Sequence, residues 1–186
     1  MAHFRKKLEE IIRVDHAGEM GAKVIYNGQM AALKLKKDEE SLKIVKHMKE
    51  QEDVHFDYFD AQIKQLHVRP TVMQPIWKVG GFAMGFFTAL IDKKAAMTCT
   101  TAVEEVIDEH YQEQLVELEK EKEFLDDDKK KEIEALTAKI EQFRQEELEH
   151  RDIGYENDAA DLKCFKPLSS LIKGATKFAI AVSKRV

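Results

Sequence analysis

The feature that most constrains the fold is a carboxylate and an imidazole that share a helix face with apolar residues. In the stretch QFRQEELEHRDIG, residues 142–154, helical spacing places Glu147 and His150 on the same side. The full face consists of Leu136, Ile140, Phe143, Glu147, His150 and Gly154. A carboxylate and an imidazole are costly to bury without partners. Something in the interior must therefore compensate for them.

The same motif, ExxH, occurs a second time in an equivalent setting. Glu52 and His55 lie on a helical stripe with Val45, Met48 and Phe59. One ExxH in a Glu-rich helix is weak evidence for a site, because 35 acidic residues make chance spacings common. Two such motifs that both lie on apolar stripes are stronger evidence.

Single glutamates take the equivalent place on two other helical stretches. Glu19 lies in DHAGEMGA, where Gly18 and Gly21 indicate a close approach to a neighbour, and Glu104 lies in AVEEV. The two stripes are Ile12, Glu19, Ala22 and Tyr26, and Met97, Thr101, Glu104, Tyr111, Leu115 and Leu118. The order along the chain is Glu, ExxH, Glu, ExxH. This order predicts two helical hairpins related by a pseudo-twofold axis in a four-helix bundle.

The remainder of the sequence agrees with an all-α fold. Helix-forming Glu, Lys, Leu, Ala and Gln are frequent, only three prolines are present, and no strand-like alternation persists. We expect one domain over residues 1–186, with long helices over about 4–37, 39–67, 94–124 and 129–157. No secretory signal is visible, and Cys99 and Cys164 are expected to be reduced thiols. The net charge of −5 offers no basic surface, so nucleic acid is not an expected partner.

Four carboxylates in one interior would repel one another unless cations compensate for them. Two metal ions satisfy this requirement, because each ExxH presents an oxygen and a nitrogen from one helical turn. This is the pattern of ferritin-like di-iron and di-manganese carboxylate proteins, and the mixed oxygen and nitrogen set suits iron or manganese. The predicted metal ligands are Glu19, Glu52, His55, Glu104, Glu147 and His150. No catalytic residue beyond these ligands is predicted.

Neighbouring residues leave alternatives open at this centre. Four nearby acids compete with the chosen ligands: Asp53, Glu105, Glu146 and Glu149. Asp15 and Asp152 are candidate acceptors for the imidazole N–H groups, or plain surface acids. Tyr111 lines the site or fills core, and His16 and His110 are placed outside the ligand set.

Two segments have a different character from the long helices. Residues 70–91 include IWKVGGFAMGFFTALI, in which Lys78 is the only charge and which is shorter than a bilayer span. This segment is interpreted as a membrane-surface element that inserts Trp77, Phe82, Phe86 and Phe87 into lipid, or as a buried crossover.

The final segment, 165–186, is expected to be a short helix that also contacts a membrane surface. Its apolar face would be Leu168, Leu171, Ile172, Ala175, Ala179 and Val182, and its lysines Lys173, Lys177 and Lys184 would group elsewhere.

Six stretches of the sequence resemble the demethoxyubiquinone hydroxylases of ubiquinone biosynthesis. They are RVDHAGEMGA, IYNGQM, QEDVHF, VRPTVMQPIW, CTTAVEEVIDEHY and FRQEELEHRDIG, within a resemblance that covers about residues 8–186. The resemblance implies a ferritin-like di-iron carboxylate protein whose iron ligands are the same six residues.

The resemblance also implies an activity and a location. The chain is expected to be a monooxygenase that uses dioxygen and two iron ions to hydroxylate the ring of a polyprenylated demethoxy-benzoquinol. Electrons would come from NADH or from a separate reductase. The expected location is peripheral, on the cytoplasmic face of a bacterial inner membrane, with a ubiquinone-biosynthesis protein as a further partner. The alternative is a ferritin-like protein that oxidises and stores iron, and a metal-free helical adaptor on membranes is a third class.

Overall fold

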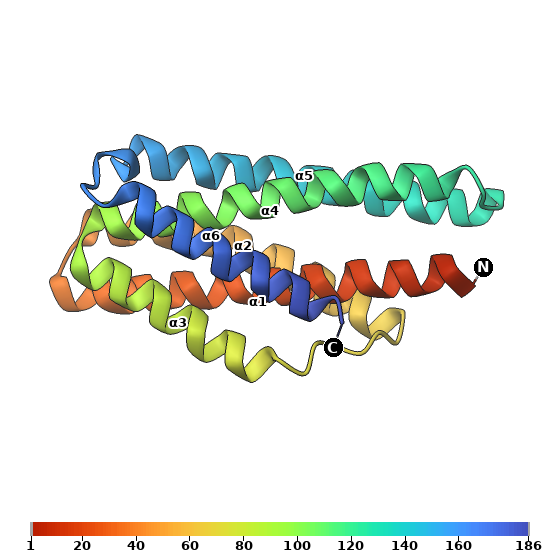
Figure 1. Ribbon diagram of the computed structural model, residues 1–186, viewed down its shortest axis with the longest axis horizontal. Coiled ribbons are helices and arrows are strands. Elements are labelled where there is room, and N and C mark those ends of the chain that lie inside the picture. The colour runs from red at the N-terminus through yellow and green to blue at the C-terminus, as the bar shows by residue number, and fades with distance from the viewer. Residues whose placement is uncertain (1, 186) are drawn as a thin grey trace.

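The computed structural model describes residues 2–185, and every regular element in this range is helical (Figure 1). The elements in chain order are α1 (Ala2–Lys36), α2 (Glu39–Gln65), α3 (Gln74–Ile91), α4 (Lys93–Lys122), α5 (Asp127–Glu156), a 3-10 turn η1 (Ala159–Asp161) and α6 (Phe165–Ser183). The expected all-α bundle is confirmed, and the expected long helices agree with α1, α2, α4 and α5 to within two or three residues.

Aspartates begin three of these helices. The side chain of Asp38 accepts a hydrogen bond from the Ser41 backbone N–H at 3.0 Å at the start of α2. Asp92 and Asp126 cap α4 and α5 in the same way. Each cap satisfies a backbone donor that has no partner inside the helix. The acidic run 126–128 therefore starts α5.

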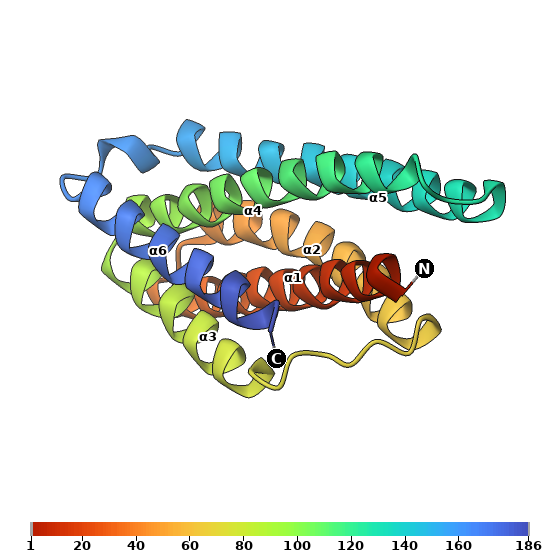
Figure 2. The same cartoon turned by 45° about the vertical axis from the view of Figure 1, so that its right-hand side comes forward.

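The four long helices run along the long axis of the molecule as two hairpins, α1 with α2 and α4 with α5 (Figures 1 and 2). Packing is more extensive within each hairpin than between α2 and α5 or between α1 and α4. The shorter helices lie across one side of this bundle. Helix α3 packs on α1 and α4, and α6 packs mainly on α4 and also contacts α1.

The core is divided into two clusters by the polar stripe residues. One cluster contains Ile12, Phe59, Ile107, Ile140 and Phe143 among its members. The second contains Tyr26, Leu33, Val45, Met48 and Met97. On α2, for example, the ExxH motif lies between Met48 of the second cluster and Phe59 of the first. The bundle therefore holds the polar groups at mid-length, with apolar packing on both sides.

Three glycines allow helices to approach closely. A Cβ at Gly85 of α3 would lie 2.0 Å from the Ile25 carbonyl oxygen, and one at Gly28 of α1 would lie 2.2 Å from the Phe82 carbonyl oxygen. A Cβ at Gly154 would lie 2.6 Å from a methyl group of Thr101.

The expectation that Gly18 and Gly21 allow a close helix contact is wrong. A Cβ at either position would meet no atom within 4 Å. These two glycines instead border an open cavity, described below.

Helix α3 has one face on the bundle and one face exposed, so the buried-crossover interpretation is wrong for its outer side. Exposed apolar side chains on α3 are Ile76, Val79, Phe82, Phe87, Leu90 and Ile91. Trp77 and Phe86 are only half exposed. The Trp77 indole N–H donates to Ser183 Oγ of α6 at 3.1 Å, so Trp77 joins the two short helices. None of the helices within residues 2–185 combines the length and the apolar character that crossing a membrane requires.

The pattern expected for α6 is only partly right. Ile172 is buried against the bundle, whereas Leu171 and Phe178 are exposed. Lys173 pairs with Glu105 and Lys177 pairs with Glu109, both on α4. These two lysines therefore reach toward the bundle, which does not match a separate basic face.

Candidate metal centre

The six predicted ligands come together in the interior at mid-bundle. Potential ligand atoms of Glu19, Glu52, His55 and Glu147 lie within 4.8 Å of one another. A second group with the same property consists of Glu52, Glu104, Glu147 and His150. Each of the six residues is at most 1% exposed. Glu52 and Glu147 belong to both groups, which is the arrangement that two cations with shared carboxylates would need.

The four residues that belong to only one group define two separate candidate cation positions. The Glu19–His55 position takes its own ligands from α1 and α2, and the Glu104–His150 position takes its own from α4 and α5. The pseudo-twofold axis expected from the order of the motifs thus relates one position to the other.

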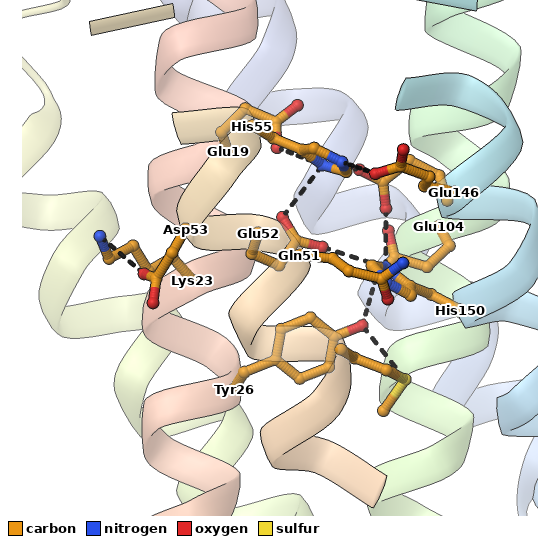
Figure 3. A network of polar contacts seen from close by, with 12 residues as sticks. Glu19, Lys23, Tyr26, Gln51, Glu52, Asp53, His55, Glu104, Glu146 and His150 are labelled. Atoms are coloured by element: carbon orange, nitrogen blue, oxygen red, sulfur yellow. Dashed lines mark hydrogen bonds and ion pairs between the residues drawn. The ribbon is translucent and has the colours of Figure 1, made fainter. Parts of the chain in front are cut away.

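Both imidazoles present the same nitrogen to the carboxylates. His55 Nδ1 lies 3.0 Å from Glu147 Oε1 and 3.4 Å from Glu19 Oε2. His150 Nδ1 lies 3.1 Å from Glu147 Oε2 and 3.2 Å from Glu52 Oε1. In a metal-bound state, the Nδ1 lone pair is therefore the one that each histidine can offer (Figure 3).

The charges of the metal-free cluster are unevenly distributed. Burial would raise the pKa of Glu147, but hydrogen bonds from His150 and His55 hold that pKa below its usual value. Burial raises the pKa of Glu52 and of Glu104 well above the usual range, and the charge of Glu147 adds to both shifts. Burial would lower the pKa of His55, but its bonds to Glu147 and Glu19 raise it to about 12. Without a cation, Glu147 therefore stays ionised between two imidazoles whose pKa values are raised.

Four buried carboxylate oxygens at the centre make no well-formed hydrogen bond among the described residues, although His55 Nδ1 lies 3.4 Å from Glu19 Oε2 and His150 Nδ1 lies 3.2 Å from Glu52 Oε1. They are Glu19 Oε2, Glu52 Oε1, Glu52 Oε2 and Glu104 Oε2. Buried acceptors are almost always satisfied in folded proteins. A pair of cations would satisfy these oxygens, so the residues present fit a di-metal centre.

Two tyrosines donate hydrogen bonds to Glu104 and Glu19, and each of these bonds joins one hairpin to the other. Tyr26 on α1 donates its hydroxyl to Glu104 Oε1 on α4 at 2.7 Å. Tyr111 on α4 donates to Glu19 Oε1 on α1. Each tyrosine follows the glutamate of its own helix by seven positions. The sequence interpretation placed Tyr111 near the site but gave Tyr26 no role, although the equal spacing was a usable signal.

The distal nitrogens of the imidazoles also have partners from the opposite hairpin. His55 Nε2 donates to Glu146 Oε2 at 2.7 Å, and His150 Nε2 donates to Gln51 Oε1 at 2.9 Å. Each acceptor directly precedes the glutamate of an ExxH motif. The sequence interpretation considered Glu146 only as a competing ligand and did not consider Gln51.

The two aspartates that were expected to accept these N–H groups are placed elsewhere. Asp152 is exposed and bonds to Arg151, and among the described residues no hydrogen bond joins it to either imidazole. The surface-acid alternative fits Asp152. Asp15 is buried and accepts from Gln114 at 2.6 Å, close to His110.

Three of the four competing acids lie away from the centre, and Glu146 contacts the distal nitrogen of His55. Asp53 pairs with Lys23 and Lys49, and Glu105 pairs with Lys173. Glu149 is exposed. Position on the apolar stripe is therefore what separates the six clustered residues from their acidic neighbours.

An apolar cavity of about 250 Å³ lies against α1 and α4, the helices that carry Glu19 and Glu104. Its walls come from α1, α3, α4 and α6 and include Gly18, Gly21, Ile25, Gly81, Met84, Val103, Ile107 and Ala179. Gly18 and Val103 directly adjoin Glu19 and Glu104 in the chain. The cavity thus lies between the helices that carry the terminal glutamates and the two short helices.

Comparison with known proteins identifies the family. The family model described as "Ubiquinone biosynthesis protein COQ7" matches residues 6–183. The chain belongs to the COQ7 family. The COQ7 match includes all six clustered residues and the whole of α3 and α6.

Curated relatives of this COQ7 chain cover nearly its full length. A 3-demethoxyubiquinol 3-hydroxylase from Rhodospirillum rubrum is 46% identical over 179 residues, which are 96% of this chain and 78% of the relative. The human NADPH-dependent 3-demethoxyubiquinone 3-hydroxylase is 43% identical, with 98% and 79% covered. The 5-demethoxyubiquinone hydroxylase of Saccharomyces cerevisiae is 40% identical, with 96% and 78% covered. The resemblance seen in the sequence motifs is confirmed.

Proposed function

We propose that the chain is a di-iron monooxygenase that hydroxylates the ring of a polyprenylated demethoxy-benzoquinol in ubiquinone biosynthesis, using dioxygen. The observation that carries this proposal is the pair of buried ligand groups that share Glu52 and Glu147. Membership of the COQ7 family and the names of the relatives supply the reaction and the substrate class.

The proposed ligands are the six clustered residues. Glu19 with His55 and Glu104 with His150 would each hold one iron, and Glu52 and Glu147 would be shared. When bound, the iron pair would supply the activation of dioxygen. The chain's own contribution is to keep the ligands in place, through the hydroxyls of Tyr26 and Tyr111, and to exclude water from a fully buried site.

The apolar cavity is the proposed binding place of the quinol. Its walls suit an aromatic ring and an isoprenoid chain, and it adjoins the helices that carry Glu19 and Glu104. Its outer walls are α3 and α6, whose exposed apolar side chains include Phe87 and Phe178. A prenyl chain could therefore leave the cavity on the same side as these exposed residues.

Electrons for the reaction would come from a reduced nicotinamide. Relatives are named NADPH-dependent, so NADPH is the proposed donor, with NADH or a separate reductase as the alternatives. Reduction could act on the quinone or on the iron pair. Stopped-flow measurements with NADPH, in the presence and absence of quinone, distinguish these routes.

The function is tested by loading the purified chain with Fe²⁺ and supplying a short-chain demethoxy-quinol with ¹⁸O-labelled dioxygen. Two irons per chain and one labelled oxygen in the product are expected. His150→Ala should lose iron and abolish hydroxylation. The matched control is His47→Ala, because His47 is exposed on α2. Wild-type turnover by His150→Ala would refute the assignment.

We also propose that residues 70–91 and 165–186 contact a membrane surface, within a single domain spanning 1–186. The support is the set of exposed apolar side chains on α3 and α6, on the same side of the bundle as the cavity. The chain would then be peripheral, on the cytoplasmic face of a bacterial inner membrane. A further ubiquinone-biosynthesis protein could bind beside it.

Vesicle sedimentation tests this placement and also separates it from iron storage. Wild-type protein should sediment with vesicles of phosphatidylcholine and phosphatidylglycerol, and Phe87→Glu should stay in the supernatant. Val54→Glu is the matched control, because Val54 is 60% exposed but lies on α2. A protein that stores iron would form a cage that does not sediment with vesicles, and it would oxidise Fe²⁺ without quinol.

A further inference from the structure

The two imidazoles have matching contacts with one chemical difference. Both direct Nδ1 toward the carboxylates and Nε2 toward the opposite ExxH helix (Figure 3). The acceptor for His55 Nε2 is the Glu146 carboxylate at 2.7 Å, and the acceptor for His150 Nε2 is the Gln51 amide oxygen at 2.9 Å.

Both contacts favour the same tautomer. An oxygen that faces Nε2 can only accept, so it favours the form in which Nε2 carries the proton and Nδ1 is free to bind a cation. Gln51 and Glu146 also come from equivalent places, each directly before the glutamate of its ExxH motif. Their positions are therefore related by the same pseudo-twofold as the ligands.

The difference lies in the charge of the acceptor. A carboxylate withdraws the Nε2 proton more strongly than an amide does, and it makes the imidazole a better electron donor at Nδ1. The Glu146 carboxylate is itself held, because its Oε1 accepts from Gln142 Nε2 at 2.9 Å. By contrast, Glu19 and Glu104 accept hydrogen bonds from the same kind of group, a tyrosine hydroxyl.

We propose that Glu146 and Gln51 are positioning residues that make the two metal positions inequivalent, with the tighter cation at the Glu19–His55 position. The inference rests on the proposed metal centre. Two residues that bind no metal themselves would thus determine which of the two positions is filled first.

The first test is a titration of metal-free protein with Mn²⁺, followed by calorimetry. Wild type should bind two ions in two separable steps. Because partners of ligand imidazoles typically change metal affinity about 10–100-fold, Glu146→Gln should weaken the tighter step by about tenfold and bring the steps together. Gln51→Glu should strengthen the weaker step, and the double exchange should separate the two steps again.

These variants are conservative, because Gln and Glu both accept a hydrogen bond from Nε2–H. Glu149→Gln is the matched control for Glu146→Gln, since it removes the same charge from an exposed site on the same helix. Gln65→Glu, exposed at the end of α2, is the control for Gln51→Glu. Both controls should leave the two steps unchanged.

The second test identifies which imidazole responds. Zn²⁺ serves as a diamagnetic probe, and nitrogen–proton correlation spectra report the tautomer and the Nε2–H proton of each histidine. The Nε2–H signal of His55 should lie at lower field than that of His150. Glu146→Gln should move only the His55 signal, and Gln51→Glu should move only the His150 signal.

The outcomes separate this inference from the proposed function. If wild type binds no Mn²⁺, the metal centre and the inference fail together. If it binds two ions with identical affinity, or if Glu146→Gln and Glu149→Gln act equally, the inference fails and the metal centre stands. An Nε2–H signal of His55 that Glu146→Gln does not move would also overturn it.

Discussion

At the scale of single residues, two carboxyl groups at the proposed metal centre keep their protons at a pH where exposed carboxyl groups are ionised. Glu52 and Glu104 have pKa values well above the usual 4.5, because they are buried beside the charged Glu147. A folded state that binds protons more tightly than the unfolded chain is stabilised below the unfolded pKa. That stabilisation is lost as the pH rises through the folded pKa.

The metal-free protein should therefore become less stable as the pH rises above about 4.5 toward the raised pKa values. Metal ions require deprotonated carboxylates, so Mn²⁺ binding should release protons and its affinity should rise with pH. Calorimetry in buffers of different ionisation enthalpy counts the released protons. Binding without proton release would contradict the assignment of protons to Glu52 and Glu104.

The tyrosine hydroxyls give a second prediction at this scale. Tyr111→Phe leaves a buried oxygen of Glu19 without its donor, so Mn²⁺ affinity should fall by about tenfold. Tyr26→Phe should have a similar effect through Glu104. Tyr155→Phe is the control, because Tyr155 bonds to Glu105 near the surface. An equal loss in all three variants would indicate a general effect of removing a hydroxyl.

At the scale of elements, glycines in α1 and α3 have two opposite uses. Gly28 and Gly85 let the backbones of α1 and α3 touch, whereas Gly18 and Gly21 leave space for the cavity. The sequence motif DHAGEMGA shows that small residues are required beside Glu19, but it does not show whether a helix or a void lies opposite. Only the position of α3 decides this.

Gly85→Ala should destabilise the fold by about 1–3 kcal/mol, because the new Cβ would overlap the Ile25 carbonyl. Gly18→Ala should stabilise it by about 0.5–1 kcal/mol, since alanine favours helix and meets no atom within 4 Å. Urea unfolding followed by circular dichroism measures both. The interpretation fails if Gly85→Ala is as stable as Gly18→Ala.

A larger side chain at the same position tests the use of the cavity. Gly18→Leu should fill part of the cavity and lower kcat/KM for the quinol by at least about tenfold, with metal binding retained. Gly174→Leu is the control, because Gly174 is exposed on α6 and has open space around it. Unchanged kinetics in Gly18→Leu would place the quinol elsewhere.

At the scale of the whole molecule, the proposed metal centre connects two hairpins that otherwise pack mainly within themselves. The ligands of each group come from both hairpins. Helices α3 and α6 add contacts across the same junction on one side. Within residues 2–185, neither α3 nor α6 packs on α2 or α5 to a comparable extent, and both short helices lie on the other side of the bundle (Figure 2).

Removing the metal should therefore loosen the junction between the hairpins. Saturation at 100 times Kd corresponds to about 2.7 kcal/mol per site, so chelation should lower Tm measurably. Hydrogen exchange should increase most near His55 and His150, on the side of α2 and α5. Uniform exchange along all helices, with an unchanged Tm, would show that the centre does not support the fold.

The sequence predicted most of the architecture because apolar periodicity defines which face of each helix is buried. The six clustered residues followed from that periodicity together with the repeated order Glu, ExxH, Glu, ExxH along the chain. Their role as metal ligands stays a prediction. Gln51 and Glu146 lie beside the stripes, so periodicity could not show that they reach imidazoles of the opposite hairpin. The exposed side of α3 and the pairing of Lys173 with Glu105 depend on how the short helices dock.

Because the contacts of Tyr26 and Tyr111 are reciprocal, each hairpin depends on the other to orient its side chains at the centre. Each hairpin supplies a hydroxyl to the other's terminal acid and an acceptor to the other's imidazole. A fragment with only one hairpin would keep a Glu and an ExxH but lose every group that orients them. A substitution in one half of the chain should therefore disturb the proposed cation position of the other half.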